Sequence, residues 1–243
     1  APHVGTVMTA ESHEDRSGDE TPWRRARAQA LVEDLANPTL DDDVEHHLRR
    51  VLRLEKGAAV CAYDGAGSWS LGTLGDGPEL EDPSPPQFTS APSARLTVGF
   101  AALKGSRTEL VVQKLTELGV DRIWILRTRR GVVRWDADRS ERQVARLGRV
   151  ASESCAQCRR LRIPDVQVMS FADAVAAGAV LADAGGRPLR REDRTVLVGP
   201  EGGWDDEERM AAESVVLGEN VLRAETAAIV AGSSMAQLRL GLR

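Results

Sequence analysis

The second half of the chain alternates between short apolar runs and longer segments with apolar residues at helical spacing. The apolar runs, which predict buried strands, are residues 96–101, 120–126, 166–169, 180–183, 196–198 and 215–217. Residues 108–118 and 138–160 place apolar side chains three and four positions apart, which predicts amphipathic helices. Because continuously apolar strands are buried on both faces, this succession predicts an α/β fold with a mostly parallel sheet and helices on both faces.

The first half of the chain has a different pattern. Residues 1–20 are polar, charged and without periodicity, which is typical of a disordered lead. Residues 23–35 are Arg-rich and then resemble a helix, and residues 44–53 carry apolar side chains at helical spacing. After Gly57, apolar and polar positions alternate on both sides of residues 64–67, which predicts a β-hairpin.

A proline-rich segment separates the two patterns. Residues 81–92 contain Pro83, Pro85, Pro86 and Pro92, which disfavour both helix and central strand. We therefore expect a small β-rich domain over residues 21–90 and an α/β domain over residues 91–243.

Residues 195–226 carry the strongest candidate chemistry. The apolar run 196–198 stops at Gly199-Pro200-Glu201-Gly202-Gly203, and the run 215–217 stops at Gly218. In parallel sheets ligands bind at the carboxyl ends of strands, and glycine lets the backbone approach a ligand closely. The pattern therefore favours a site built from main-chain N–H and C=O groups. A tight turn with a solvated Glu201 fits the same residues equally well.

The distribution of charge changes what the net charge of −5 implies. Residues 104–164 contain 15 Lys and Arg against 7 Asp and Glu, so this segment is basic although the whole chain is acidic. A basic face attracts phosphates, but salt-bridged helix surfaces would account for some of these arginines as well.

The cysteines and the distribution of apolar residues indicate in which cellular compartment the protein is expected. Cys155 and Cys158 have CxxC spacing without a second pair, so we expect them and Cys61 to be reduced structural thiols and expect no metal site. The chain contains no run of about 18 apolar residues and no signal-peptide pattern. We therefore expect a cytoplasmic protein with no membrane partner.

Four blocks in the second half resemble a known family in their order and spacing. The blocks are Lys104-Gly105-Ser106-Arg107 with residues 113–120, then residues 157–164, 198–203 and 217–227. Together they resemble the RsmE family, the 16S ribosomal RNA uracil-N3 methyltransferases of the SPOUT (trefoil-knot) superfamily. Residues 46–53 with Asp64-Gly65 resemble, more loosely, the start of that family's PUA-like β-barrel.

The resemblance implies a fold, an oligomeric state and a cofactor. Residues 91–243 would form a SPOUT sheet whose C-terminal chain is threaded through a loop as a trefoil knot, and residues 21–90 a PUA-like β-barrel that binds RNA. A homodimer would complete the site, and the knot loops would hold S-adenosyl-L-methionine. The residues implied for the cofactor are Ala182, Asp183, Val198, Gly199, Pro200, Glu201, Gly202, Gly203, Leu217, Gly218, Val221, Leu222, Thr226 and Ala227.

The resemblance also implies methyl transfer to N3 of a uridine in 16S ribosomal RNA of the small ribosomal subunit. Because uracil N3 carries a proton, a cation beside the flanking carbonyl oxygens would favour the reactive anion. We expect Arg223 to supply that cation and Glu225 or Glu201 to accept the proton. The alternative for Arg223 is a salt bridge to one of these glutamates.

Basic and amide side chains in both domains are candidates for RNA binding. Because N3 must be exposed, the target uridine should be single-stranded or locally opened. We expect supporting phosphate contacts from Arg129 and Arg130. The principal residues expected to bind RNA are Arg49, Arg53, Lys104, Arg107, Lys114, Gln157, Arg160 and Arg162.

Several positions depart from the family's pattern. Ala156 stands where the family usually has an acidic residue, Asn220 where it has an arginine, and Ala224 where it has a threonine. Two alternatives follow. One is a SPOUT methyltransferase that acts on tRNA or 23S ribosomal RNA, and the other is an RNA-binding protein with impaired catalysis.

Overall fold

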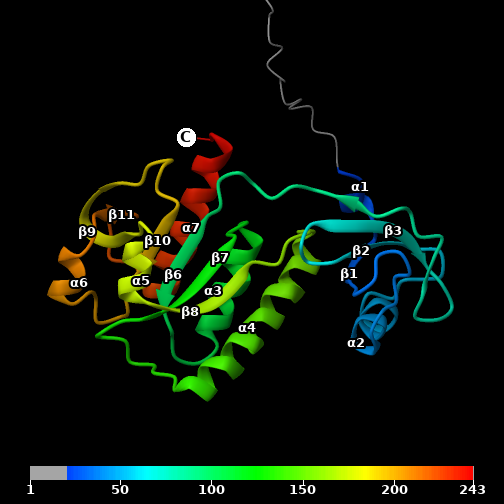
Figure 1. Cartoon of the computed structure of the whole chain (residues 1–243), viewed down its shortest axis with the longest axis horizontal. Helices are drawn as coiled ribbons and strands as arrows, with labels where there is room; N and C mark the ends of the chain where they lie inside the picture. The colour runs from blue at the N-terminus through cyan, green and yellow to red at the C-terminus, as the bar shows by residue number, and fades with distance from the viewer. Residues whose placement is uncertain (1–20, 243) are drawn as a thin grey trace, which may run out of the picture.

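The computed structural model describes residues 21–242 and contains two parts, each built around a β-sheet (Figure 1). The expected disordered lead, residues 1–20, lies outside the described residues. One sheet contains β1 to β5 and the other contains β6 to β11. The change from one sheet to the other falls between Phe88 and Thr97, in the segment where the sequence places a boundary near residue 90.

The smaller part is a five-stranded sheet with short helical segments. The hairpin predicted around residues 64–67 is confirmed, because β2 and β3 are antiparallel with Tyr63 opposite Trp69. The sheet has the order β1-β2-β3-β4, and β5 pairs with β3. Its elements are α1 (Pro22–Arg25), β1 (Ala28–Leu31), α2 (Asp42–His46), the π-helical turn η1 (His47–Val51), β2 (Ala59–Tyr63), β3 (Ser68–Leu74), β4 (Leu80–Glu81) and β5 (Gln87–Phe88).

Strand β1 shows that the helical interpretation of residues 23–35 is wrong beyond Arg25. Ala28–Leu31 pairs in parallel with β2, and Ala28 and Ala30 are buried in the cluster beneath the sheet. Pairing with a strand distant in the sequence, together with burial, outweighs the local helical preference of alanine and leucine.

The larger part is a six-stranded sheet in the order β11-β9-β10-β6-β7-β8. Every pairing in it is parallel, which confirms the predicted α/β fold. The threading of the chain through a loop, which the family resemblance implies, stays a prediction. The elements are β6 (Thr97–Ala101), α3 (Arg107–Glu117), β7 (Arg122–Arg127), α4 (Ala137–Cys158), β8 (Asp165–Ser170), α5 (Phe171–Ala176), β9 (Val180–Pro188), β10 (Thr195–Val198), α6 (Asp206–Met210), β11 (Ser214–Val216) and α7 (Ala224–Leu240).

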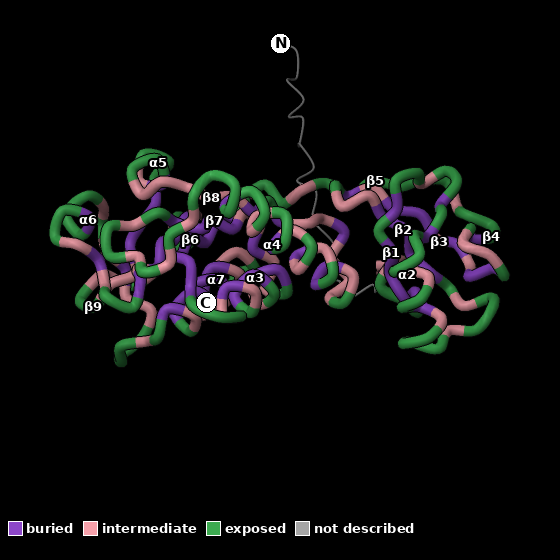
Figure 2. The backbone as a smooth tube through the Cα atoms, turned by 90° about the horizontal axis from the view of Figure 1, so that it is seen from below, coloured by how far each residue is buried: buried purple, intermediate pink, exposed green. Residues whose placement is uncertain are grey.

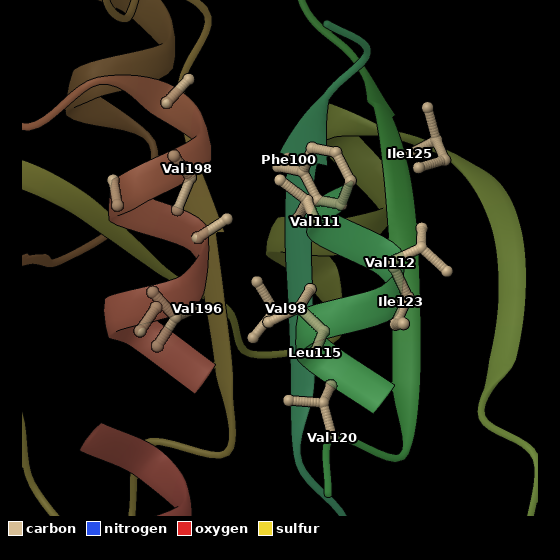
Figure 3. Close-up of a cluster of buried hydrophobic side chains, with 14 of the residues drawn as sticks. Val98, Phe100, Val111, Val112, Leu115, Val120, Ile123, Ile125, Val196 and Val198 are labelled. Carbon is tan, nitrogen blue, oxygen red and sulfur yellow. The ribbon is translucent and has the colours of Figure 1, made fainter. Parts of the chain in front are cut away.

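Alternate side chains of the parallel strands enter two hydrophobic clusters. Ile123 and Ile125 of β7 lie in a cluster with α3, α4 and α7, whereas Trp124 and Leu126 lie in a cluster with α5. Because successive strand side chains point to opposite faces, helices cover both faces of the sheet, as predicted. Figure 3 shows the first cluster, with Leu115 of α3 directed toward β6.

The C-terminal end of α4 joins the larger part to the smaller one. Cys155 and Leu161 are buried in one cluster with Cys61, Tyr63 and Trp69 of the smaller sheet. Burial disfavours the charged thiolate and raises the pKa of Cys61 and of Cys155 to about 12. All three cysteines are free, as the sequence analysis expects.

In both parts, residues along the strands are mostly buried and residues in the surrounding loops are mostly exposed (Figure 2). Among residues 21–242, no helix is both long enough and apolar enough to cross a membrane.

Candidate functional site

A cavity of about 600 Å³ lies at the carboxyl-terminal edge of the larger sheet. It opens where β9 separates from β10 after Ala182 and is bounded by the segments that follow β10 and β11. Ala227 of α7 forms part of its wall. Its position is the usual ligand site of parallel sheets, and its volume falls within the range of small-molecule pockets.

Most residues that the resemblance implies for the cofactor line this cavity. Gly202 and Thr226 belong to the same predicted set but lie outside the lining. The carbonyl of Gly202 instead accepts a hydrogen bond from Arg130 Nη1 at 3.3 Å, and Thr226 is exposed on the first turn of α7. The lining residues of the set are Ala182, Asp183, Val198, Gly199, Pro200, Glu201, Gly203, Leu217, Gly218, Val221, Leu222 and Ala227.

The loop after β10 has the tight backbone that its glycines predict. Gly203 has a φ of +70°, and its N–H donates to the carbonyl of Pro200 at 2.8 Å. Helix α6 begins directly after the loop, where Asp205 and Glu208 form a capping box. The loop is therefore held in one conformation from both ends.

Trp204 is a residue of the site that the sequence analysis does not single out. Its side chain is 1% exposed, and its indole N–H donates to the carbonyl of Ala182 at 3.0 Å. A Cβ added at Gly199 would lie 3.1 Å from its ring. Trp204 thereby ties the loop after β10 to β9, and its only sequence signal is its position directly after Gly202-Gly203.

The loop after β11 presents unpaired main-chain groups to the cavity. Within residues 21–242, no hydrogen bond uses the backbone N–H groups of residues 219–222, which line the cavity. A Cβ added at Gly218 would meet no atom within 4 Å. Peptide groups need hydrogen-bond partners when water is displaced from them, so this loop suits a ligand with donors and acceptors at its edge.

Arg107 lies between the two glutamates that the resemblance implies for catalysis. Its guanidinium is 3.3 Å from Glu201 Oε1 and 3.5 Å from Glu225 Oε2. It therefore connects the start of α3 to the loop after β10 and to the first turn of α7. Of these three charged residues only Glu201 lines the cavity. Arg107, expected as an RNA contact alone, is connected to the cavity through its pair with Glu201.

Arg223 lines the cavity and is exposed. In the described part of the chain its side chain has no ion pair and caps no helix. The salt bridge considered as its alternative role is absent there, because Glu201 and Glu225 both pair with Arg107. The Arg223 guanidinium is consequently available to a ligand.

The other residues expected to bind RNA differ in whether their side chains already have partners within the protein. Lys114 pairs with Glu117 at 2.9 Å near the surface, where such contacts are weak and exchange readily. Arg49 is held by more partners, because its Nε pairs with Glu45 at 2.8 Å and its Nη2 donates to the carbonyls of Gly75 and Gly77 at 3.0 and 2.7 Å. These partners use the donors that a phosphate would need, which corrects the assignment of Arg49 to the RNA surface. The exposed members of the set are Arg53, Lys104 and Gln157.

Arg160 has a structural role, which corrects its assignment to the RNA surface. Its Nη1 donates to the carbonyls of Thr116 and Val120 at 3.2 and 2.6 Å, and its Nη2 lies 2.9 Å from Asp121 Oδ1. Burial lowers the pKa of Arg160 and outweighs the opposing effect of Asp121. These partners use the donors that a phosphate would need.

Arg162 is corrected for a similar reason. Its guanidinium donates to the carbonyls of Ala66 and Thr89 in the smaller part of the molecule and lies 5.1 Å from the ring centroid of Phe88. Arg162 therefore fastens the two parts together.

The fold and the cavity define a class of protein. A parallel sheet whose strand-end loops surround a cavity with glycine backbone and unpaired peptide groups is typical of α/β enzymes that bind a nucleotide-like cofactor. Residues 89–236 match the model of the RNA methyltransferase domain, and residues 40–78 match that of the RNA methyltransferase PUA domain. The chain belongs to this RNA methyltransferase family.

Individual relatives agree with the family model. The ribosomal RNA small subunit methyltransferase E of Synechocystis is 31% identical over 81% of this chain and 71% of its own length. The enzyme of the same name from Rickettsia conorii is 28% identical over 86% of this chain and 92% of its own length. A solved structure of the Neisseria gonorrhoeae enzyme of that name, bound to S-adenosyl methionine, superimposes with a TM-score of 0.74 at 25% identity, covering 87% of this chain and 97% of its own.

Proposed function

We propose that this protein methylates N3 of a specific uridine in 16S ribosomal RNA of the small ribosomal subunit, with S-adenosyl-L-methionine as methyl donor. The observation that carries the proposal is the backbone-lined cavity beside residues 182–185 of β9 and at the ends of β10 and β11, which contains most of the residues implied for that cofactor. Relatives that cover both parts of the chain are named small-subunit ribosomal RNA methyltransferases, which supports the substrate.

The cavity fits the cofactor chemically. The unpaired N–H groups of residues 219–222 and the glycine backbone around Gly199 and Gly218 suit an adenine edge and a ribose. Trp204 holds the wall between β9 and the loop after β10. When bound, S-adenosyl-L-methionine supplies an electrophilic methyl group, and the protein's task is to position the uracil nitrogen and remove its proton.

Arg223 is proposed as the cation beside the uracil carbonyl oxygens. Its guanidinium lines the cavity without a protein counter-ion in the described residues, so its positive charge is available to the uracil anion. Glu201 or Glu225 would accept the N3 proton. Arg107 contacts each carboxylate through one oxygen, which leaves the other oxygen for the proton, and of the two glutamates Glu201 lines the cavity. This chemistry requires no metal.

RNA would approach the cavity across Lys104 and Arg107 at the start of α3. Gln157 lies near the end of α4, at the opposite edge of the sheet and beside the smaller part, and would contact RNA there. Arg53 is exposed on the smaller part and Lys114 holds only a surface ion pair, so both can add phosphate contacts. We further propose that the protein acts as a homodimer in the cytoplasm, where ribosomal subunits mature.

The test is methyl transfer to small ribosomal subunits from cells that lack the activity. Labelled S-adenosyl-L-methionine, enzyme and subunits are incubated, and the RNA is digested to identify the modified nucleoside. We expect 3-methyluridine, and we expect Arg223→Ala to lower the rate by about a hundredfold or more while cofactor affinity stays within about twofold. Arg223→Lys should retain part of the rate.

Arg149→Ala, a change at an exposed position of α4, is the matched control and should behave as wild type. Label in tRNA or 23S ribosomal RNA instead would replace the proposed substrate. Cofactor binding without transfer to any RNA, or no cofactor binding, would favour an RNA-binding protein with impaired catalysis.

A further inference from the structure

The molecule has a second, larger cavity of about 900 Å³ that the proposed reaction does not use. It lies at the carboxyl ends of β7 and β8, between α5, the start of α4 and the connecting segment 127–135. Its interior is apolar, with Ile125, Val168 and Val175 among the lining residues. Its position on the same sheet edge places it beside the cofactor cavity.

Aromatic and cationic groups surround this second cavity. Trp135 and Phe171 line it, and the guanidiniums of Arg127 and Arg134 lie at its rim. Within residues 21–242 neither arginine has a carboxylate partner, because Arg127 reaches only the hydroxyl of Ser140, at 3.5 Å, and Arg134 only a backbone carbonyl. Glu207 and Glu208 also line the cavity, but Glu207 pairs with Arg129, and Glu208 accepts the backbone N–H of Arg129. Arg127 and Arg134 therefore keep their positive charge at the rim.

Aromatic faces beside cations are the chemistry that binds an unstacked nucleotide, because the base stacks on a ring and the guanidiniums reach its phosphates. Thr128 also belongs to the lining, but its Oγ1 is shielded from solvent and therefore does not face the open space of the cavity. The aromatic residues and the arginines are consequently the groups that a ligand would meet.

The segment 127–135 is tied directly to the loop of the cofactor cavity. Arg129 donates its backbone N–H to Glu208 Oε1 at 2.9 Å, and Arg130 Nη1 donates to the carbonyl of Gly202 at 3.3 Å. Phe171 also packs on Trp204, with ring centroids 5.5 Å apart, so the two cavities share a wall. An occupant of the second cavity would therefore lie next to the methyl donor.

We propose that the second cavity binds one unstacked nucleotide of the substrate RNA, adjacent to the target uridine. The base lies between the apolar interior and Trp135, and Arg127 and Arg134 contact its flanking phosphates. This proposal rests on the proposed function, because it assumes an RNA substrate that reaches the cofactor cavity. In this proposal the segment 127–135 positions the RNA and takes no part in the methyl transfer itself.

Binding of small ribosomal subunits to the full chain, measured over a range of salt concentrations, tests the cationic rim. We expect Arg127→Gln and Arg134→Gln each to weaken binding and to reduce the slope of log K against log salt by about 0.7, the value for one phosphate of a single strand. Arg149→Gln is the matched control, since nine residues after Ser140 place it on about the opposite side of α4. Slopes equal to that of the control would overturn the role of the rim.

The base itself is tested by substitution and by cross-linking. Trp135→Leu should raise the KM for subunits roughly fivefold to a hundredfold through lost stacking, with cofactor affinity and melting temperature near those of wild type. Ultraviolet irradiation of the enzyme–subunit complex should attach a nucleotide to the tryptic peptides that contain Trp135 or Phe171. Cross-links confined to other peptides, together with an unchanged KM, would refute the proposal.

The outcomes also separate this proposal from the proposed function. If wild-type enzyme transfers no methyl group to small subunits, the proposed function fails whatever the variants do. If wild-type enzyme is active and the variants at Arg127, Arg134 and Trp135 match the control, only the second cavity loses its role.

Discussion

At the scale of single residues, the site depends on side chains that fix the backbone of its loops. Trp204 is the principal example, because one buried indole both donates to Ala182 and packs on Phe171. It is central to the wall between the two cavities. A second tryptophan in the same cluster, Trp124, is also buried, but its indole N–H has no partner in the described residues.

This difference predicts how the two tryptophans respond to replacement by phenylalanine. Trp204→Phe removes a buried hydrogen bond and leaves the carbonyl of Ala182 without the indole donor. The free energy of unfolding should therefore fall by about 1–3 kcal/mol, and cofactor affinity should fall as well. Trp124→Phe loses similar ring volume without losing a hydrogen bond. Denaturant unfolding and titration calorimetry of both variants measure the effect, and equal stability losses would contradict the role given to the Trp204 hydrogen bond.

At the scale of elements, β9 shapes the cofactor cavity by leaving the regular sheet. It pairs with β10 only as far as Ala182, and its register with β11 shifts between Ser214 and Val215. Gly186 lies at this irregularity, where an added Cβ would be 2.6 Å from the backbone of Ser214 and Val215. The close approach of two backbones at this point therefore requires glycine.

Gly186→Ala should consequently separate β9 from β11. We expect overpacking to cost about 1–3 kcal/mol of stability. Cofactor binding should also weaken, because β11 leads directly into residues 217–223, which line the cavity. Gly148→Ala on α4, where an added Cβ meets nothing within 4 Å, should instead stabilise the protein by about 0.5–1 kcal/mol. Thermal unfolding and cofactor titration compare the two. If Gly186→Ala leaves the melting temperature and the cofactor affinity unchanged, β9 accommodates the added methyl group and glycine is not required there.

At the scale of the whole molecule, the two parts are joined by a buried cluster and by arginines that donate to backbone carbonyls. Arg159 reaches the carbonyl of Arg27 at 2.8 Å, and Arg162 reaches Ala66 and Thr89. Cys61 and Cys155 lie in the cluster between the parts. The orientation of the smaller part relative to the active edge therefore depends on these contacts.

The cysteines provide a measure of this junction. With a pKa raised to about 12, Cys61 and Cys155 have almost no thiolate at pH 8, so alkylation should require opening of the molecule, whereas the partly exposed Cys158 should react first. Arg162→Ala should accelerate alkylation of Cys61 and Cys155 by roughly tenfold or more, since it removes charge-assisted hydrogen bonds. Mass spectrometry of the labelled peptides, with Arg149→Ala as control, gives the rates. Rates equal to that control would mean that Arg162 does not hold the parts together.

Much of the fold follows from local patterns in the chain. Apolar runs, the helical spacing in α3 and α4 and the glycines after β10 act over a few neighbouring residues, so the parallel sheet, its helices and the position of a cavity after β10 and β11 could be predicted. The strand β1 could not, because its partner β2 is distant in the sequence and supplies the pairing that outweighs local helical preference.

The roles of individual arginines depended on contacts between distant segments. By composition, Arg107, Arg160, Arg162 and Arg223 are equivalent cations, and the sequence could assign the first three only to RNA. Folding brings Asp121 to Arg160 and places Arg107 between Glu201 and Glu225, while Arg223 keeps its charge free at the cavity. Because a guanidinium acts on whichever acceptor lies within reach, only the three-dimensional arrangement distinguishes a structural arginine from one available to a ligand.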